Sequence, residues 1–270
     1  MTYFGFLLRF LLIPIVALLG LLWWDRRRGR ETAVTLRGWP VSWSIGLHVL
    51  VALIYTTPWD NYLVATRVWW YDPALVTGLT LGWVPIEEYT FFVLQPILAG
   101  LWLAFWARRL TLPSRITDYG LRIRIGSVAV LAIVWLATAV ILITGWKPGT
   151  YLALELVWAL PPIVLQLGFG ADILWRYRCL VFLSIIPLTL YLSFADALAI
   201  NWGTWTIDPA QSLNIYLGGV LPVEEFIFFL LTNTLVTFGI VLVWAEASHQ
   251  RLIQIKNIVS RIKLASSVKN

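Results

Sequence analysis

Seven long apolar segments restrict what this sequence can fold into. They cover roughly residues 3–24, 41–57, 79–106, 123–143, 151–168, 180–199 and 215–244, the second and fifth being the shortest. About 20 apolar residues in a helix cross the hydrocarbon core of a bilayer. Hydrophobic residues make up 60% of the chain and charged residues only 13%, which is more apolar surface than a soluble domain can bury. We therefore predict an all-α, multi-pass membrane protein of the cell membrane, with seven transmembrane helices.

Basic residues gather in alternate loops, which predicts how the helices are oriented. Cytoplasmic loops of membrane proteins are enriched in Lys and Arg. The opposite loops here hold only Arg67 and Lys147, so we expect the N-terminus outside and the C-terminus in the cytoplasm. The same distribution explains the net charge of +6 without nucleic acid as a partner. The loops assigned to the cytoplasm carry Arg26, Arg27, Arg28, Arg30, Arg37, Arg108, Arg109, Arg115, Arg122, Arg124, Arg176 and Arg178, and the tail carries Arg251, Lys256, Arg261, Lys263 and Lys269.

One short motif occurs twice at the outer end of a predicted helix. It runs Pro85-Ile86-Glu87-Glu88-Tyr89-Thr90-Phe91-Phe92 and again Pro222-Val223-Glu224-Glu225-Phe226-Ile227-Phe228-Phe229. We expect each proline in the first helical turn, where its missing N–H costs nothing. The glutamates would follow at the positive end of the helix dipole. Ionisable groups within an apolar span are costly, which makes these four carboxyl groups candidates for a functional site.

The motif belongs to a longer internal repeat. Thr2-Tyr3 matches Thr150-Tyr151, Asp60 matches Asp196, and Trp69-Trp70-Tyr71-Asp72-Pro73 matches Trp205-Thr206-Ile207-Asp208-Pro209. Predicted helices 1–3 thus repeat as 5–7, with the fourth as a spacer, which predicts a parallel 3+1+3 duplication. Sites in such duplications lie at the repeat interface, so the third and seventh helices should face each other. We divide the chain into a first repeat (1–110), a linker with the fourth helix (111–148), a second repeat (149–247) and a basic tail (248–270).

The residues of the motif suit acid chemistry on an apolar molecule. Adjacent helical residues project about 100° apart, so one glutamate of each pair can face inward. A carboxylic acid in an apolar site can keep its proton and act as a local acid, and aromatic faces stabilise cations. The sequence holds 17 Trp, 13 Phe and 10 Tyr, so some of these rings can line a cavity. Together these features favour protonation of an alkene followed by rearrangement of a carbocation.

Structural roles for the same residues stay open at this point. The glutamates could cap helices or form ion pairs with Arg9 or Arg67. Asp72 and Asp208, each before a proline, are typical of turns or helix caps, and Trp69 and Trp205 could belong to an interfacial belt. The recurrence of Asp60 and Asp196 indicates shared architecture without indicating chemistry. The single cysteine, Cys179, and the two distant histidines, His48 and His249, predict no disulfide and no metal site.

The doubled Pro-x-Glu-Glu-x-x-Phe-Phe motif, each copy after an Asp-Pro loop, resembles the non-flavin lycopene cyclases in their fused, two-repeat form. The resemblance implies cyclisation of the linear ends of lycopene to β-ionone rings, through γ-carotene to β-carotene, with no net redox change. It leaves open which glutamate donates the proton. No Gly-x-Gly-x-x-Gly is present, so we expect no cofactor. The implied catalytic residues are Glu87, Glu88, Glu224 and Glu225; the implied substrate-binding residues are Trp69, Asp72, Pro85, Phe91, Phe92, Gln95, Asp196, Trp205, Asp208, Pro222, Phe228, Phe229 and Asn233.

Other functions compete with this one. A cyclase of longer C50-type carotenoids, or one giving another ring isomer, would use the same acid. A seven-helix transporter with carboxylates for protons or substrate is possible, but transporters usually interrupt helices in mid-membrane. A retinal photoreceptor needs a lysine within a helix, and the lysines lie in a loop and the tail. Leu7 stands where the second repeat has Glu155, and Arg9 where it has Val157, which favours one site over two. The expected partners are a linear carotenoid and the lipid bilayer; a homo-oligomer or association with other carotenoid enzymes stays open.

Overall fold

The structure is a computed structural model that describes residues 1–36, 38–111 and 120–267, with the side chains of 34, 259 and 261–267 left out. Three of the basic residues assigned to the cytoplasmic side, Arg37, Arg115 and Lys269, lie outside the described residues. So do the side chains of Arg261 and Lys263.

Among the described residues, seven helices are long and apolar enough to cross a membrane, as predicted. The first is built from α1 (Tyr3–Leu7), a π-helical turn (Leu8–Leu12) and α2 (Ile13–Arg27). The others are α3 (Val41–Ala65), α4 (Ile86–Ala107), α5 (Gly120–Thr144), α6 (Thr150–Arg176), α7 (Arg178–Asn201) and α8 (Val223–Trp244). Short 3-10 turns cover Val34–Leu36 and Lys147–Gly149, and a polar helix, α9 (Glu246–Ser267), follows α8. The second span is longer than predicted because α3 continues through Pro58. The fifth is longer because α6 continues past residue 168, across a kink at Gly170.

Two predicted helix starts are wrong. The apolar segments at 79–106 and 215–244 open with β-hairpins, formed by β2 (Thr80–Leu81) with β3 (Val84–Pro85) and by β5 (Tyr216–Leu217) with β6 (Leu221–Pro222). Glycines with φ between +58° and +76°, Gly82 in the first and Gly218 and Gly219 in the second, allow these turns. Pro85 and Pro222 therefore end strands and occupy the N-cap positions of α4 and α8, one residue before the predicted first turn.

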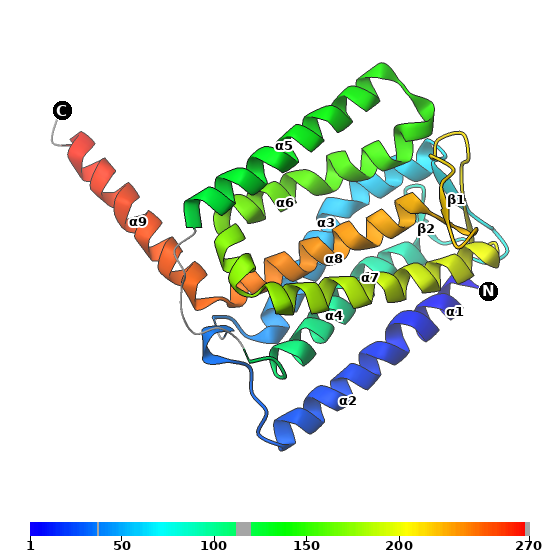
Figure 1. Cartoon of the computed structure of the whole chain (residues 1–270). Coiled ribbons are helices and arrows are strands. Elements are labelled where there is room, and N and C mark those ends of the chain that lie inside the picture. The colour runs from blue at the N-terminus through cyan, green and yellow to red at the C-terminus, as the bar shows by residue number, and fades with distance from the viewer. Residues whose placement is uncertain (37, 112–119, 268–270) are drawn as a thin grey trace.

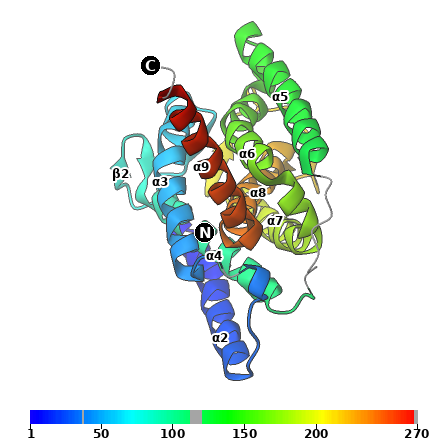
Figure 2. The same cartoon turned by 90° about the vertical axis from the view of Figure 1, so that its left-hand side faces the viewer.

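Helices α4 and α8 lie in the middle of the bundle and contact each other (Figure 1). Gln95 of α4 donates a hydrogen bond to Asn233 of α8 at 2.8 Å. As Figure 1 shows, α5 and α2 lie at opposite edges, α5 packed on α6 and α2 on α4. Helix α9 leaves the bundle at the end opposite the hairpins and contacts α6 and α8 (Figure 2). Among the described spans, α4 is the most buried, and α8 is as buried as α7.

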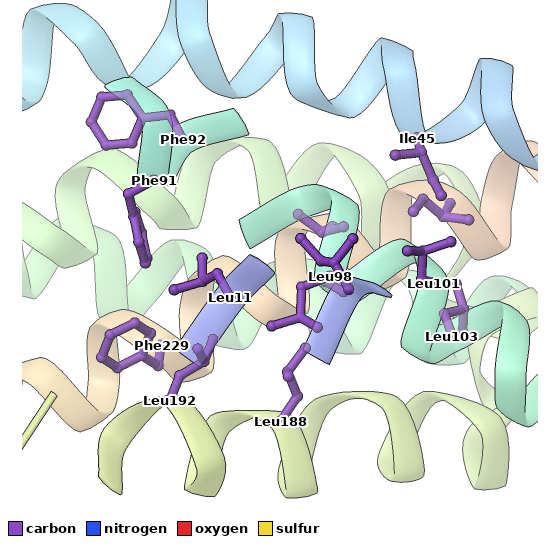
Figure 3. Close-up of a cluster of buried hydrophobic side chains, with 14 of the residues drawn as sticks. Leu11, Ile45, Phe91, Phe92, Leu98, Leu101, Leu103, Leu188, Leu192 and Phe229 are labelled. Atoms are coloured by element: carbon purple, nitrogen blue, oxygen red, sulfur yellow. The ribbon is translucent and has the colours of Figure 1, made fainter. Parts of the chain in front are cut away.

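Buried aliphatic side chains fill the centre of the bundle. Figure 3 shows Leu11, Leu98, Leu188 and Leu192 meeting between the first span, α4 and α7, with Phe91 and Phe229 next to them. The π-helical turn beside Leu11 precedes Pro14, which has no N–H to offer the carbonyl of Phe10. The hydroxyl of Tyr191 donates to that carbonyl instead, at 3.1 Å. This exchange ties the first span to α7.

The loops before the two hairpins pair with each other. Strand β1 (Trp69–Tyr71) and strand β4 (Trp205–Ile207) form an antiparallel ladder in which Trp69 faces Ile207 and Tyr71 faces Trp205. The N–H of Asp72 donates to Thr204 O at 3.2 Å, and the N–H of Asp208 donates to Val68 O at 2.8 Å. The ladder joins the two halves of the chain directly above the starts of α4 and α8. At the opposite end, the guanidinium of Arg109 binds buried Asp25 through both nitrogens, at 2.6 and 2.9 Å.

Candidate active site

A cavity lies beneath the β1–β4 ladder, between the starts of α1, α4, α6 and α8 and the ends of α3 and α7. We call it the acid chamber, because four carboxyl groups, three tyrosines and eight other aromatic rings line it. Its lining residues are Tyr3, Phe6, Trp59, Asp60, Trp69, Tyr71, Glu88, Phe91, Phe92, Tyr151, Asp196, Trp205, Ile207, Glu225, Phe228 and Phe229.

The two glutamates of each motif have different surroundings. Glu88 and Glu225 line the acid chamber, whereas Glu87 and Glu224 point away from it. Glu87 accepts a hydrogen bond from the N–H of Thr77 at 2.6 Å. Glu224 accepts from the N–H of Leu213 at 2.7 Å and from Ser212 at 3.1 Å. The first glutamate of each pair holds the loop before the hairpin, and the 100° step along the helix turns the second toward the chamber.

Two phenols hold the carboxyl group of Glu88. Its Oε2 accepts hydrogen bonds from the hydroxyls of Tyr3 and Tyr71, the latter at 3.0 Å. The indole N–H of Trp69 donates to the Tyr71 oxygen at 3.0 Å. Burial, and then the nearby Glu88 carboxyl, raise the pKa of Tyr71 well above its usual value. Tyr71 therefore stays protonated and donates to Glu88.

The carboxyl group of Glu225 has one phenol and one carboxyl neighbour. Its Oε1 accepts a hydrogen bond from Tyr151 at 2.8 Å, and the carboxyl of Asp196 lies within hydrogen-bonding reach of it. The indole N–H of Trp205 donates to Asp196 Oδ1 at 2.9 Å. Behind Tyr151 lies Glu155, which is fully buried and has no hydrogen-bond partner for either oxygen among the described residues.

The aspartates lie deeper than the glutamates. Asp60 and Asp196 are each 1% exposed, whereas Glu88 is 9% and Glu225 is 6% exposed. Neither oxygen of Asp60 has a hydrogen-bond partner among the described residues. The glutamates are therefore the carboxyl groups that a molecule in the chamber can reach most readily, and the aspartates support them from behind.

Aromatic rings form the chamber walls. Trp59 stacks on Phe228 with ring centroids 6.0 Å apart, and Phe91 meets Phe229 edge to face at 6.3 Å. Across the chamber, Trp205 contacts Tyr3 at 4.9 Å and Phe6 at 5.1 Å. Ring faces carry negative electrostatic potential and attract cations. A cation formed in the chamber would therefore be surrounded by favourable partners and shielded from water.

The other predicted site residues lie outside the chamber. Asp72 and Asp208 accept hydrogen bonds from the N–H groups of Ala74 and Ala210, at 2.9 and 3.0 Å, and thereby form turns in the surface loops. Gln95 and Asn233 bind each other below the chamber, and Asn233 also donates to Thr189 at 3.1 Å. Pro85 and Pro222 are buried helix caps. Of the predicted set, the chamber brings together Trp69, Glu88, Phe91, Phe92, Asp196, Trp205, Glu225, Phe228 and Phe229.

No described arginine neutralises the chamber. Ion pairs away from the chamber join Arg30 and Arg109 to Asp25, and Arg251 to Asp172. Arg9 contacts the sulfur of Met1, and the guanidinium of Arg67 lies 5.9 Å from the Trp70 ring centre. No group of three or more His, Cys, Asp or Glu in the described ranges is arranged to hold a metal ion. The chamber therefore offers carboxyl groups, phenols and aromatic faces.

Known proteins of one family are similar to this chain over most of its length. The lycopene beta-cyclase of Halobacterium salinarum is 36% identical over 220 residues, which cover 81% of this chain and 85% of that protein. The chain belongs to the lycopene cyclase family. It is also similar to the bifunctional lycopene cyclase/phytoene synthases of Aspergillus niger, 35% identical over 72% of this chain, and Podospora anserina, 37% identical over 72%, and matches about a third of each of those proteins. No protein-family model matches the chain, and no solved structure is similar to it.

Several residues of this lycopene cyclase chamber are absent from the site that the sequence predicts. Tyr3 and Tyr151 lie at matching positions of the two predicted repeats, but a tyrosine at a helix end is also typical of an interfacial belt. Tyr71 lies in a loop whose fold depends on pairing with β4. Asp60 recurs as Asp196, and this recurrence was the signal that could have placed it in the site.

Proposed function

We propose that this protein is a lycopene β-cyclase, which closes the linear ends of lycopene into β-ionone rings in carotenoid biosynthesis. One observation carries the proposal: two carboxyl–phenol pairs line one aromatic chamber at the hairpin end of an apolar helical bundle. The name of the Halobacterium relative supports the same reaction. The substrate is a hydrocarbon of the bilayer interior, so its chemistry requires a strong local acid, a base and a dry cation-stabilising wall.

Glu225 is the general acid of this mechanism. Two carboxyl groups within hydrogen-bonding reach do not both ionise readily, and the pair retains a shared proton. Asp196 therefore helps to keep one proton on itself or Glu225, and Tyr151 fixes the orientation of Glu225. This proton adds to the terminal double bond of lycopene. The addition leaves a tertiary cation, which the rings of Trp59, Phe228 and Phe229 stabilise.

Glu88 is the general base. Hydrogen bonds donated to a carboxylate stabilise its charge, and Glu88 accepts two of them on Oε2. The electrons of the next alkene attack the cation and form the new carbon–carbon bond of the ring. Glu88 then removes a ring proton, and the electrons of that C–H bond form the ring double bond. One proton enters and one leaves, so the reaction is an isomerisation that consumes no electrons; the proton returns across the chamber to the Asp196–Glu225 pair.

We further propose that the chain is a duplicated unit, with repeats at 1–110 and 149–247 around a linker at 111–148, and a basic tail at 248–270. Matching contacts support this proposal. The N–H of Tyr3 donates to Leu75 O at 2.8 Å, and that of Tyr151 to Gln211 O at 2.9 Å; the N–H groups of Ile86 and Val223 repeat the pattern on Leu79 and Ile215. A pseudo-two-fold axis along the membrane normal would pass through the β1–β4 ladder. The distribution of basic residues supports an outer position for the chamber and a C-terminus in the cytoplasm of a cell membrane protein.

Expression in cells that accumulate lycopene tests the function. We expect cyclic carotenoids, identified by chromatography of extracted pigments, without added flavin or nicotinamide. The Glu225→Gln variant, expressed at the same membrane level, serves as the control and should leave lycopene unchanged. Unchanged lycopene with well-expressed wild-type protein would argue against the proposed reaction.

A further inference from the structure

A second cavity adjoins the acid chamber and runs along α8 away from it. We call it the polyene groove; α3, α6 and α8 form its walls, and the first turns of α4 close it toward the chamber. The groove and the chamber share Phe91, Phe92 and Phe228 as lining residues. These three rings, which come from both copies of the motif, form the boundary between the two spaces.

The hollow continues to the far end of α8. A third cavity shares Gln166, Gly239 and Val243 with the groove and is also lined by Trp39 and by Leu252 of α9. Along α8, the lining of the three spaces extends from Glu225 to Val243, and at 1.5 Å per residue this is about 27 Å. The path is therefore nearly as long as the hydrocarbon core of a bilayer is thick.

Flat rings form the wall of the groove nearest the chamber. Tyr55, Trp158, Trp59 and Phe228 stack in succession, with interplanar angles of 23°, 18° and 5°. Tyr55 and Trp59 also bind carbonyls of α6, at 2.8 and 3.0 Å, and so hold α3 against α6 beside the chamber. Further along α3, Leu47 and Val51 are both groove-lining and exposed. The groove therefore opens sideways between α3 and α6, toward lipid.

We propose, on the basis of the function proposed above, that the polyene groove holds the conjugated body of the carotenoid while one end group lies in the acid chamber. Three features select this occupant. The groove adjoins the chamber across three shared rings, and most of its lining surface is apolar, although His48, Gln95 and Gln166 contribute polar atoms. The three cavities together have a length that suits an extended polyene rather than a lipid headgroup or a compact ligand. The groove thus fixes which double bond reaches Glu225. It makes Phe91, Phe92 and Phe228 the residues that set how far an end group enters.

Filling the groove without touching the chamber tests this assignment. Ala52 lines the groove and is half-buried, whereas Ile54 on the same helix is 67% exposed and lines none of these cavities. We expect Ala52→Trp to lower the turnover of lycopene at least about tenfold, a loss of about 1.4 kcal/mol of transition-state stabilisation. Ile54→Trp should stay within about twofold of wild type, because surface substitutions away from a site have small effects.

A shortened substrate separates the groove from general damage to the protein. An apocarotenoid that keeps one acyclic end group but lacks the far half of the polyene should be cyclised by Ala52→Trp nearly as well as by wild type. Full activity of Ala52→Trp on lycopene, or an equal loss on both substrates, would overturn the assignment. Failure of wild-type protein to cyclise lycopene would instead overturn the proposed function.

Protection of engineered cysteines from labelling measures whether lycopene occupies the groove, and it requires no turnover. In a Glu225→Gln, Cys179→Ser background, which removes turnover and the one exposed native thiol, single cysteines replace Ala52 or Ile54. We expect lycopene in the bilayer to slow the labelling of position 52 by an apolar maleimide several-fold and to leave position 54 unchanged. Equal labelling rates at position 52 with and without lycopene would contradict the groove as its binding site, whatever the activity of the enzyme.

Discussion

The two sides of the acid chamber carry the same residue types but connect them differently. On the first side, Glu88 accepts from Tyr3 and Tyr71, and Asp60 has no hydrogen-bond partner among the described residues. On the second side, Glu225 accepts from Tyr151 and has Asp196 beside it. In the proposed mechanism, the first arrangement would stabilise a negative charge and the second would retain a proton. The proposed duplication would then supply a base and an acid from equivalent positions.

One position of the β1–β4 ladder explains much of this difference. Tyr71 in β1 corresponds to Ile207 in β4 of the second repeat. On the first side, the indole of Trp69 donates to the Tyr71 hydroxyl. With isoleucine in place of that hydroxyl on the second side, the indole of Trp205 donates to Asp196 instead. The difference between Tyr71 and Ile207 thus decides the acceptor of the neighbouring indole: a phenol for Trp69 and the carboxyl group of Asp196 for Trp205. The bond from Trp205 holds Asp196 beside Glu225.

The largest effect should come from the acid. Glu225→Gln removes the proton donor but keeps the size and a hydrogen-bonding amide, so we expect cyclisation to fall about 10³-fold, within the 10²–10⁴ range typical of general acids. Its neighbour Glu224 supplies the matched control. Glu224→Gln retains an oxygen for the N–H of Leu213 and should keep most of the activity. The rate of lycopene cyclisation per membrane-inserted protein is measured for both variants. Equal losses in the two would show that the chamber glutamate and the loop glutamate do not differ in function.

The base should matter next. Glu88→Gln leaves the acid in place, so protonation still occurs, but the ring proton must go to a weaker acceptor. We expect a loss of about 10²-fold, with Glu87→Gln as the control that only holds the loop through Thr77. Initial rates in membranes with lycopene provide the measurement. A larger loss for Glu88→Gln than for Glu225→Gln would indicate that the roles of acid and base are the reverse of those proposed.

The spans could be predicted from the sequence, because they depend on a local apolar pattern. The internal repeat stays a prediction that rests on recurring motifs. Apolar runs of helix length required seven spans, and the recurrence of Asp60, Trp69 and the glutamates marked equivalent positions. The hairpins could not be predicted from the apolar pattern. The strand residues Thr80-Leu81 and Val84-Pro85 continue the apolar segment of the helix that follows them. Only glycines with positive φ distinguish these turns, and a single glycine is also common within membrane helices.

The chamber could be predicted only in part, because its order depends on contacts between distant residues. Helical geometry indicates that one glutamate of each pair faces inward, but the choice of Glu88 over Glu87 follows from the loop that binds Glu87. The pairing of β1 with β4 joins residues more than 130 positions apart, and no local pattern specifies it. The Tyr3–Glu88 contact likewise joins the first helix to the third. Without these contacts, the tyrosines looked like interfacial residues.

A smaller effect should follow from removing the Tyr71 hydroxyl. Tyr71→Phe leaves Glu88 with Tyr3 as its phenol donor and deprives the Trp69 indole of its acceptor. A hydrogen bond to a charged group contributes about 1.5–3 kcal/mol, and part of this should appear as a loss of about tenfold in turnover. Ile207→Tyr is the reciprocal change: a new phenol near Trp205 should compete with Asp196 for the indole. Turnover of both variants, compared at equal protein level, tests whether the ladder is the source of the asymmetry. Wild-type rates in both variants would show that it is not.

The smallest effect on turnover should come from Glu155, the carboxyl group that the first repeat lacks. Glu155 is fully buried beside Tyr151, near Glu224 and Glu225, and neither of its oxygens makes a well-formed hydrogen bond among the described residues. Such a group costs about 1–3 kcal/mol of stability when it stays unpaired. Glu155→Leu copies the residue of the first repeat, Leu7, and should raise the free energy of unfolding in detergent by a similar amount.

If Glu155 also passes protons through Tyr151 to Glu225, turnover should fall only a few-fold, because Asp196 still shares a proton with the acid. Glu155→Gln is the control: it removes the transferable proton but keeps the buried polar group, so it should lower turnover to the same extent without gaining stability. A stabilised Glu155→Leu variant with unchanged turnover would assign Glu155 no part in proton transfer and confine the functional asymmetry to Tyr71, Asp196 and Glu225.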